Sequence, residues 1–462
     1  MKNMLKKQVK KLFLYFPFLY GFYSFFANKA IRKRVSDIVT KLEKIELYSE
    51  VRRAELQRSE LFSLLEYATE YTEYYKNIFD EKNIQLNSID SFKKIPILTK
   101  SIIRANEKAL LSRQFNLNHL SKRNTGGSTG KPLEFYVDKL SGANDNAHHW
   151  YLYSKMGYKK GDMIVSCGGF NLPEKQLGKN LFWLKNYKDC VWGEYAFSAL
   201  YMTSENIHLY VDKLVLLRPS ILRGYPSFWD SIATYILAHN IQMPFKVKGI
   251  NLTAEMCSVS QRKNIEKAFN TLVYFEYGHT EMCLYCYTLD SSYIYQSSPI
   301  YGYIEIVDEH GYDVDVGEIG KVVVTGFNNI GMPFIRYDTG DLVELSYRNG
   351  GIVKFKKIIG RNQDFIVSKS GQKVFLTGLI FGQHLKAFSR IKHWQLIQNE
   401  IGIVNILIVK ESTYDKMDED EILKNFNKVT DVDLFFSYVD DIPLTKRGKH
   451  LFLINNLNGD FN

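Results

Sequence analysis

A nine-residue run from Asn124 to Pro132, reading NTGGSTGKP, carries the groups that polyphosphate binding requires. Its glycines allow backbone N–H groups to approach phosphate oxygens, and the hydroxyls of Ser128 and Thr129 can donate hydrogen bonds. Lys131 adds a positive charge next to these donors. The sequence therefore predicts a loop that wraps a polyphosphate.

The spacing within this loop differs from that of the Walker P-loop. The Walker motif needs glycine where this chain has Thr125, and serine or threonine where it has Pro132. Pro132 has no N–H and disfavours the helical conformation at Lys131, so no helix begins there. Apolar and polar residues alternate after Leu133, which predicts a strand. These differences exclude a P-loop kinase or NTPase.

The loop resembles the phosphate loop of the adenylate-forming enzymes, the superfamily of acyl- and aryl-CoA ligases. Further stretches resemble motifs of that superfamily, and they occur in its order along the chain. These stretches are Tyr277–Glu281 (YGHTE), Tyr337–Asp341 (YDTGD), Gly360–Asp364 (GRNQD) and Pro443–Lys449 (PLTKRGK). Each string is short, but their order over residues 124–449 makes the resemblance specific.

Two more stretches resemble one branch of this superfamily. Leu222–Ser227 (LRGYPS) and Ile95–Lys100 (IPILTK) are similar to segments of phenylacetate–CoA ligases and of the CapK-type proteins of capsular polysaccharide clusters. The resemblance implies ATP-dependent activation of a small carboxylic acid as an acyl-adenylate. The acyl group would then pass to CoA, a carrier or a sugar acceptor in surface polysaccharide biosynthesis. The implied cofactors are ATP and Mg²⁺, with CoA as one acceptor.

The resemblance also assigns nucleotide-binding roles to individual residues. The phosphates would be bound by the loop residues Thr125, Gly126, Ser128, Thr129, Gly130 and Lys131. Tyr277 and Gly278 would lie beside the adenine, and Thr280 near the α-phosphate. Glu281 would bind the metal, and Asp341 would accept hydrogen bonds from both ribose hydroxyls. The alternative for Asp341 is a turn aspartate, because Thr-Gly-Asp is a good turn sequence.

Three further residues are implied by the resemblance. Glu255 lies in an element that precedes the adenine pocket, and Arg361 would reach the ribose or a phosphate from a hinge at Gly360. Lys449 would bridge the carboxylate and the α-phosphate when a mobile C-terminal lid closes. Relatives usually carry Asp or Lys where this chain has Gln363, which leaves the pivot residue open. The alternative for Lys449 is a solvated lysine in the basic run of residues 446–450.

The pocket for the acid is less defined. By resemblance it includes residues 166–171 and 224–227, with Phe170 and Tyr225 as candidate walls. The histidine pair His148 and His149 resembles a site, but such a pair on a helix is more often packed or solvated. A catalytically degenerate scaffold protein at a membrane surface is the alternative function. The presence of Lys131, Glu281, Asp341 and Lys449 argues against it.

The charge of the chain is concentrated at its N-terminus. The net charge is +10, but residues 1–34 contain nine lysines and arginines and no acid, which leaves 51 basic against 50 acidic side chains. The rest of the chain is therefore nearly neutral, and nucleic acid is not an expected partner. Residues 12–27 are aromatic and apolar but shorter than the ~20 residues of a membrane span. We expect either peripheral binding to an anionic membrane or packing on the body, with export least favoured.

The remaining features predict the architecture and the compartment. Five widely spaced cysteines indicate free thiols in a reducing cytoplasm. If the N-terminal segment binds a membrane, we therefore expect it on the inner face. Leu61, Leu64 and Leu65 recur at helical spacing, which predicts helix over residues 36–79, and residues 92–99 around Pro96 are expected to form an extended connector. Helical and strand patterns alternate between residues 140 and 239, which predicts an α/β body. We expect a basic N-terminal segment (1–34), an adenylation body of sheets flanked by helices plus a small β region (35–359), and a small mobile α+β lid (360–462).

Overall fold

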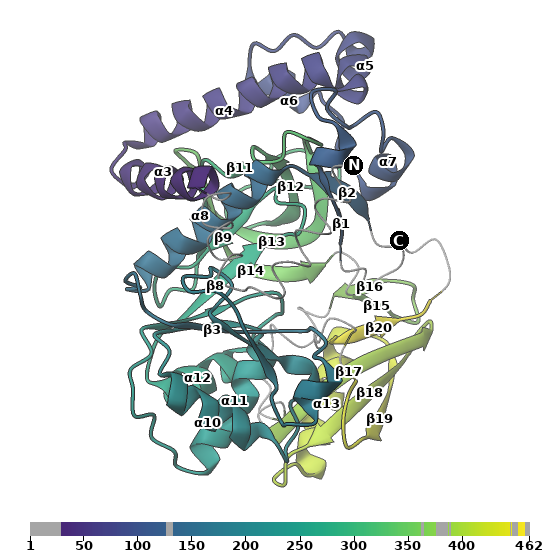
Figure 1. Ribbon diagram of the computed structural model, residues 1–462. Helices are drawn as coiled ribbons and strands as arrows, with labels where there is room; N and C mark the ends of the chain where they lie inside the picture. The colour runs from purple at the N-terminus through teal and green to yellow at the C-terminus, as the bar shows by residue number, and fades with distance from the viewer. Residues whose placement is uncertain are drawn as a thin grey trace.

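The computed structural model describes residues 29–125, 133–361, 365–375, 387, 390–443, 445 and 451–457 (Figure 1). Three helices open the described chain: α3 (Lys29–Glu46), α4 (Glu50–Tyr71) and α5 (Glu73–Lys82). Ser49 and Thr72 cap the last two by accepting hydrogen bonds from backbone N–H groups in the first turn. Leu61, Leu64 and Leu65 lie on the buried side of α4, as their spacing predicted.

The segment around Pro96 connects these helices to the rest of the body. An extended connector was expected over residues 92–99, but Phe92 lies in a short helix, α6 (Ile89–Lys93). Ser88 and Ser91 form a capping box that begins this helix. The chain is extended at Leu98, whose N–H donates to the carbonyl of Arg336 (2.8 Å). Thr99 then caps α7 (Lys100–Ala105).

A hairpin presents the predicted phosphate loop. After the 3₁₀ turn η1 (Leu117–His119), β1 (Ser121–Asn124) and β2 (Glu134–Val137) pair antiparallel. The strand expected after the glycine-rich run is therefore confirmed as β2. The next helix, α8 (Lys139–Lys155), is capped by Asp138, which accepts from the N–H groups of Leu140 (2.7 Å) and Ser141 (3.1 Å).

The body is organised around one sheet of 12 strands in the order β11-β12-β13-β14-β10-β9-β8-β7-β6-β3-β5-β4. Its parallel part comprises β3 (Ile164–Gly168), β5 (Tyr195–Ser198), β6 (Ile221–Gly224), β7 (Gly249–Leu252) and β8 (Val273–Gly278). Its antiparallel strands are β4 (Trp183–Lys185), β9 (Tyr285–Tyr287), β10 (Tyr295–Ser297), β11 (Gly302–Val307), β12 (Ile319–Gly326), β13 (Tyr337–Asn349) and β14 (Ile352–Arg361).

Strand β8 joins the parallel and antiparallel parts. It pairs parallel with β7 up to Phe275 and antiparallel with β9 from Glu276 onward. Because successive side chains of a strand point to opposite faces, Glu276 and Tyr277 project to opposite sides of this junction.

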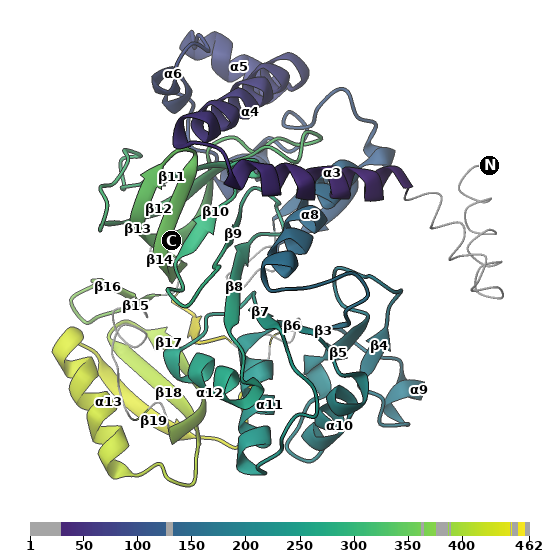
Figure 2. The same ribbon diagram turned by 90° about the vertical axis from the view of Figure 1, so that its left-hand side faces the viewer.

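Helices cover both faces of the parallel strands (Figure 2). One face packs on α10 (Ile207–Leu217), α11 (Pro226–Ala238) and α12 (Val259–Phe269), with Trp229 buried at the centre of the cluster. On the other face, α8 packs with α3 in a cluster that includes Leu42 and Leu152. Two short elements, α9 (Glu174–Leu177) and η2 (Ala199–Tyr201), complete this part.

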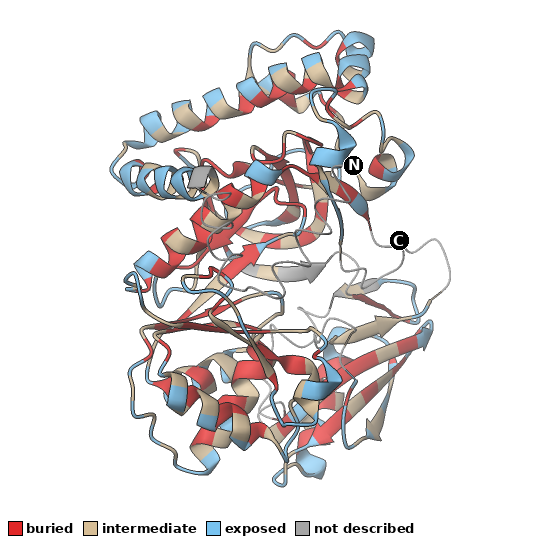
Figure 3. Ribbon diagram, in the orientation of Figure 1, coloured by how far each residue is buried: buried red, intermediate tan, exposed pale blue. Residues whose placement is uncertain are grey.

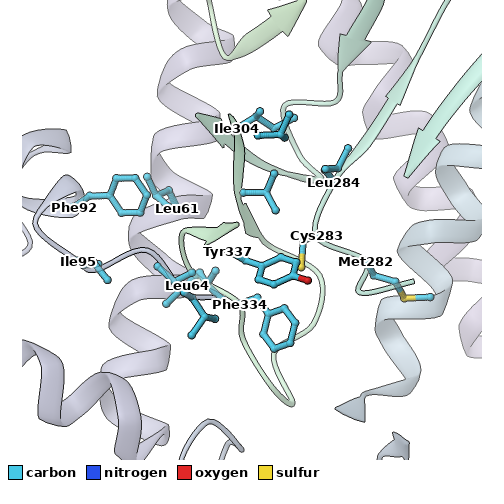
Figure 4. Close-up of a cluster of buried hydrophobic side chains, with 14 of the residues drawn as sticks. Leu61, Leu64, Phe92, Ile95, Met282, Cys283, Leu284, Ile304, Phe334 and Tyr337 are labelled. Atoms are coloured by element: carbon cyan, nitrogen blue, oxygen red, sulfur yellow. The ribbon is translucent and has the colours of Figure 1, made fainter. Parts of the chain in front are cut away.

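The antiparallel strands have their own core beneath α4 (Figure 4). Leu61 and Leu64 pack in one cluster with Phe92, Phe334 and Tyr337. The inward faces of these elements are buried, and the outer faces of α3 and α4 are exposed (Figure 3).

The C-terminal residues form a smaller unit. A hairpin of β15 (Phe365–Val367) and β16 (Lys373–Phe375) precedes a sheet in the order β19-β18-β17-β20. The strands are β17 (Ile391–Glu400), β18 (Ile403–Lys410), β19 (Asp433–Tyr438) and β20 (Leu453–Asn455), and α13 (Lys416–Val429) packs with them. The α/β body with a small α+β C-terminal unit is thus confirmed. The division into 1–34, 35–359 and 360–462 remains a proposal; α3 crosses its first boundary and β14 its second.

Two expectations concern the cysteines and the aromatic N-terminal segment. All five cysteines are free, and all but Cys257 are buried. No helix within the described residues is long and apolar enough to cross a membrane. The aromatic segment of residues 12–27 lies outside the part of the chain that the structure describes.

Candidate functional site

Four loops meet at the carboxyl ends of the parallel strands β3, β6, β7 and β8. This edge is where open α/β sheets bind ligands. The Tyr225 hydroxyl after β6 accepts from the N–H of Gly169 after β3 (3.2 Å), so the two segments that carry the predicted walls of the acid pocket adjoin. Glu255 after β7 accepts from the N–H of Ser227 (3.1 Å) in the first turn of α11. The predicted acid-binding segments and Glu255 therefore lie together.

Gly224 allows this close approach at the end of β6. Its φ is +134°, and a Cβ at this position would lie 2.2 Å from the Sγ of Cys167. The N–H of Tyr225 then reaches the same sulfur (3.1 Å). A side chain at residue 224 would force β3 and β6 apart, which explains a glycine in the LRGYPS stretch.

The predicted adenine and ribose residues are joined by direct hydrogen bonds. The Tyr277 hydroxyl donates to Oδ2 of Asp341 (2.7 Å), and Nε2 of His279 lies 3.0 Å from the same oxygen. Burial, and then the carboxylate of Asp341, raises the pKa of Tyr277 well above its ordinary value. The carboxylate accepts from Nε2, so this nitrogen carries a proton. Nδ1 of His279 is buried and has no hydrogen-bond partner among the described residues.

A tight turn brings Asp341 to this position. Gly340 has φ +80°, and its N–H donates to Oδ1 of Asp338 (2.8 Å). Asp338 thus makes the turn contact that was the alternative role for Asp341. Asp341 lies opposite Arg361 in the β13–β14 register, which puts the hinge motif's backbone beside it. A Cβ on Gly340 would lie 4.0 Å from Nζ of Lys100, which brings the early IPILTK stretch to the same turn.

Glu281, the predicted metal ligand, is the last residue of the YGHTE stretch and follows His279 by two residues. It is buried, its Oε1 accepts from the Tyr337 hydroxyl (2.8 Å), and its Oε2 accepts from Thr280 (3.2 Å). The described residues contain no group of three or more His, Cys, Asp or Glu that could bind a metal ion. Mg²⁺, however, is usually held by one or two carboxylates together with substrate phosphates and water. A single oriented carboxylate beside a nucleotide site fits that mode of binding.

The other predicted residues are only partly described. Thr125 closes the base of the glycine-rich loop, because its N–H donates to the Leu133 carbonyl (2.9 Å) and its Oγ1 accepts from the Leu133 N–H (3.0 Å). For Arg361 only the backbone is described. The loop and lid residues that lie outside the described part are Gly126, Ser128, Thr129, Gly130, Lys131 and Lys449. Their roles remain predictions.

A second cluster, which we call the buried ion cluster, lies between α8 and the sheet. Glu276 is its centre: Oε1 accepts from Nη2 of Arg223 (3.0 Å), and Oε2 accepts from Nδ2 of Asn251 (2.8 Å). Nδ1 of His149 is also 3.0 Å from Oε2. Asp145 lies 3.5 Å from Nε2 of His149. The cluster thus contains two carboxylates and two cationic side chains.

Charge pairing in this cluster overrides the effect of burial. Burial alone would lower the pKa of His149, but Glu276 and Asp145 raise it to about 9. Burial favours a raised pKa for Glu276, yet Arg223 and His149 hold that pKa well below its ordinary value. The neighbouring His148 has no carboxylate in contact, and burial lowers its pKa to about 4. His149 is therefore charged at neutral pH, and His148 is neutral.

Sequence reasoning missed most of this cluster. The sequence left His149 as either packed or solvated, and it did not point to Asp145, Arg223, Asn251 or Glu276. A signal was available, because Arg223 and Glu276 interrupt apolar strands just before their carboxyl ends. His279 was also missed, as the variable position of the YGHTE stretch. The Cys283–Cys286 pair is buried and free, as expected of ordinary packing residues.

Comparison with known proteins identifies the family and the fold. Residues 366–456 match the family described as CapK C-terminal domain. A crystal structure of 2-hydroxyisobutyryl-CoA ligase in the postadenylation state superposes with a TM-score of 0.67 at 16% identity, covering 87% of this chain and 90% of the other. The acyl acid amido synthetase GH3.15 superposes with a TM-score of 0.56 at 15% identity, covering 87% and 88%. The fold is therefore that of adenylate-forming ligases.

The sequence comparison is more specific. Protein CapK of Staphylococcus aureus is 30% identical over 429 residues, which span 89% of this chain and 92% of that protein. The match includes the body, with the loops around β8, as well as the C-terminal unit. This chain belongs to the CapK family.

Proposed function

We propose that this protein activates a small carboxylic acid with ATP to form an acyl-adenylate and pyrophosphate. The observation that carries the proposal is the meeting of Tyr277, His279 and Asp341. These residues come from two motifs far apart in the sequence, and they surround one carboxylate beside the carboxyl ends of the parallel strands. The solved 2-hydroxyisobutyryl-CoA ligase structures contain acyl-AMP, and two of them also contain CoA, which supports an acid substrate and CoA as an acceptor.

Each group would make a distinct contribution to the reaction. Asp341 would accept hydrogen bonds from the ribose, with its orientation fixed by Tyr277 and His279. Glu281 would hold Mg²⁺, which supplies charge neutralisation at the phosphates. The glycine-rich loop and Lys131 would bind the β- and γ-phosphates. The acid carboxylate would attack the α-phosphate in line, with Lys449 stabilising the charge that develops between them.

We further propose that residues 360–462 act as a mobile lid and that the product enters capsular or other surface polysaccharide assembly. The CapK relative supports the second point. The deciding experiment is ATP–pyrophosphate exchange by the purified protein against a panel of carboxylic acids, with AMP formation measured in the presence of CoA. Exchange that depends on one class of acid is expected. If no acid supports exchange and ATP does not raise the melting temperature, the scaffold alternative is correct.

The N-terminal segment is proposed to bind an anionic membrane surface from the cytoplasmic side. Each Lys or Arg near such a surface contributes ~1 kcal/mol. Because α3 begins at Lys29 and packs on the body, a deletion of residues 1–28 leaves this helix complete. This deletion removes five of the nine basic residues of the segment, so it should weaken salt-sensitive co-sedimentation with anionic vesicles and leave exchange unchanged. A truncated protein that sediments as fully as the unaltered protein would show that residues 1–28 do not bind lipid.

A further inference from the structure

Two buried polar atoms in the ion cluster have no hydrogen-bond partner among the described residues. They are Nε of Arg223 and Oδ1 of Asn251. The Asn251 side chain is fully buried, and the Arg223 side chain is 11% exposed. A buried donor or acceptor without a partner costs ~1–3 kcal/mol. The presence of two such atoms on neighbouring strands indicates that a bound molecule forms hydrogen bonds with them.

The rest of the cluster fixes the direction of both atoms. Asn251 donates Nδ2 to Glu276, so its amide orientation is set and Oδ1 points away from that carboxylate. Arg223 donates Nη2 to the other oxygen of Glu276, and the Trp192 ring stacks on its guanidinium at 4.6 Å. Neither side chain can turn to find another partner without breaking a contact with the buried carboxylate.

The position of these atoms relates them to the acid rather than to the nucleotide. Arg223 and Asn251 lie opposite each other in the β6–β7 register, immediately before the residues that end these strands. Glu276 precedes Tyr277 in β8 and projects to the opposite side from the ribose-binding candidates. The pair lies on the α8 side of the sheet, one residue inside the edge from which the loops that carry Phe170 and Tyr225 leave β3 and β6.

We propose that Arg223 and Asn251 bind a hydroxyl group of the acid substrate, so that this protein selects hydroxylated carboxylic acids. The inference rests on the adenylation proposed above. A hydroxyl accepts from Nε–H of Arg223 and donates to Oδ1 of Asn251 with one atom. A carboxylate cannot donate to Oδ1, and an ammonium cannot accept from Nε–H. An apolar acyl chain leaves both atoms unsatisfied, which is the arrangement that discriminates most strongly between substrates.

The experiment compares matched pairs of acids in pyrophosphate exchange: 3-hydroxybutyrate with butyrate, and glycerate with propionate. We expect kcat/KM for the preferred hydroxylated acid to exceed that of its deoxy counterpart by at least ~100-fold. Arg223→Lys keeps the charge facing Glu276 and removes the Nε–H donor. In this variant the kcat/KM of the hydroxylated acid should exceed that of its deoxy counterpart by less than about tenfold. The melting-temperature increase caused by ATP should be unchanged.

A matched control is available on α12. Arg262 also pairs with a glutamate, Glu266 (3.1 Å), and also stacks on an aromatic ring, Tyr293 (3.9 Å). Arg262→Lys makes the same chemical change away from the ion cluster. It should leave the ratio of hydroxylated to deoxy acid as in the unaltered protein, which separates loss of the Nε–H donor from a general loss of stability.

The outcomes separate this inference from the function on which it rests. Equal turnover of hydroxylated and deoxy acids, or an Arg223→Lys variant with full discrimination, would mean that the two atoms bind only water, and the inference would fail while adenylation stands. If no acid supports exchange, adenylation itself fails. In that case the acid is added without ATP. The inference stands if the hydroxylated acid raises the melting temperature of the unaltered protein but not that of Arg223→Lys, and it fails with any other result.

Discussion

The two sides of β8 differ in how their polar groups are balanced. On the Tyr277 side, one carboxylate, Asp341, accepts from a phenol and an imidazole. On the Glu276 side, two carboxylates face an arginine and a charged histidine in a buried cluster. The first side carries the residues that are proposed to bind the nucleotide. The second carries Arg223 and Asn251, which are proposed to select the acid.

The proposed acid specificity and the proposed nucleotide binding therefore lie on opposite sides of one strand. Glu276 and Tyr277 are consecutive residues, yet only Tyr277 belongs to a motif with a general role. The hydrogen bonds of Tyr277 and Asp341 can be read from a superfamily pattern, whereas those of Arg223 and Asn251 follow from the structure alone. The predictions below test whether the two sides act independently, beginning with the residue expected to act on both.

Lys449→Ala should have the largest effect, because this lysine is proposed to act where the acid and the nucleotide meet. We expect the rate of adenylation to fall at least ~1,000-fold, which corresponds to ~4 kcal/mol of lost transition-state stabilisation. ATP affinity and the preference among acids should remain. Rapid-quench measurement of acyl-adenylate formation, beside calorimetric ATP binding, provides the check. A variant with normal adenylation would assign Lys449 to a solvated basic run.

Glu276→Gln should mainly destabilise the fold. The change leaves Arg223 without its buried counter-charge and leaves His149 with Asp145 alone, and breaking a buried pair costs ~3–5 kcal/mol. Chemical denaturation measures this loss directly. The folded fraction should still bind ATP, because the Tyr277 side is untouched. Loss of ATP binding in a variant that remains folded would show that the two sides of β8 are coupled.

The adjacent histidines should give opposite pH dependences. His149, with a pKa raised from 6.5 to about 9, contributes stability that is complete below pH 6.5 and lost as pH rises toward 9. The contribution reaches ~3 kcal/mol. His148, with a pKa lowered to about 4, makes the protein lose stability as pH falls from 6.5 toward 4.

Denaturation curves between pH 4 and 9 test both directions. Replacing His149 by Gln should flatten the alkaline limb, and replacing His148 by Gln should flatten the acid limb attributable to this residue. If His149→Gln leaves the alkaline limb unchanged, His149 is not held in its charged form by Glu276 and Asp145.

Asp341→Ala should have the smallest of these effects and confine it to ATP. Hydrogen bonds to a charged group contribute ~1.5–3 kcal/mol, so ATP affinity should fall ~10–100-fold. Tyr277→Phe removes one of the donors that orient Asp341 and should cost ~1 kcal/mol or less. Isothermal titration with ATP measures both. A change in the ratio of hydroxylated to deoxy acid in either variant would contradict the separation of the two sides.

The sequence predicted the features that depend on local pattern and on general chemistry. Leu61, Leu64 and Leu65 indicated the buried side of α4, and the alternation after Leu133 indicated β2. The α/β body and the small α+β C-terminal unit followed from the same patterns. The short helix at Phe92 was missed because a capping box of two serines, rather than the nearby proline, decides the local structure there.

The ion cluster could not be predicted, because it depends on tertiary pairing. His149 becomes charged only when α8 brings it onto Glu276 of β8. Arg223 and Asn251 become partners only through the β6–β7 register. The sequence favoured a ribose role for Asp341 and left a turn aspartate as the alternative; in the structure the Gly340 N–H donates to Asp338, and the ribose role remains a prediction. The roles of Lys131 and Lys449 still rest on motif order.

The change of pairing partner along β8 has an evolutionary consequence. An insertion or deletion within this strand would exchange the two faces, since a shift of one residue turns every side chain over. Point substitutions at residues 223, 251 and 276, in contrast, alter one face and leave the other in register. Substitutions within the strands can therefore change the face proposed to select the acid, while the face proposed to bind ATP is inherited unchanged.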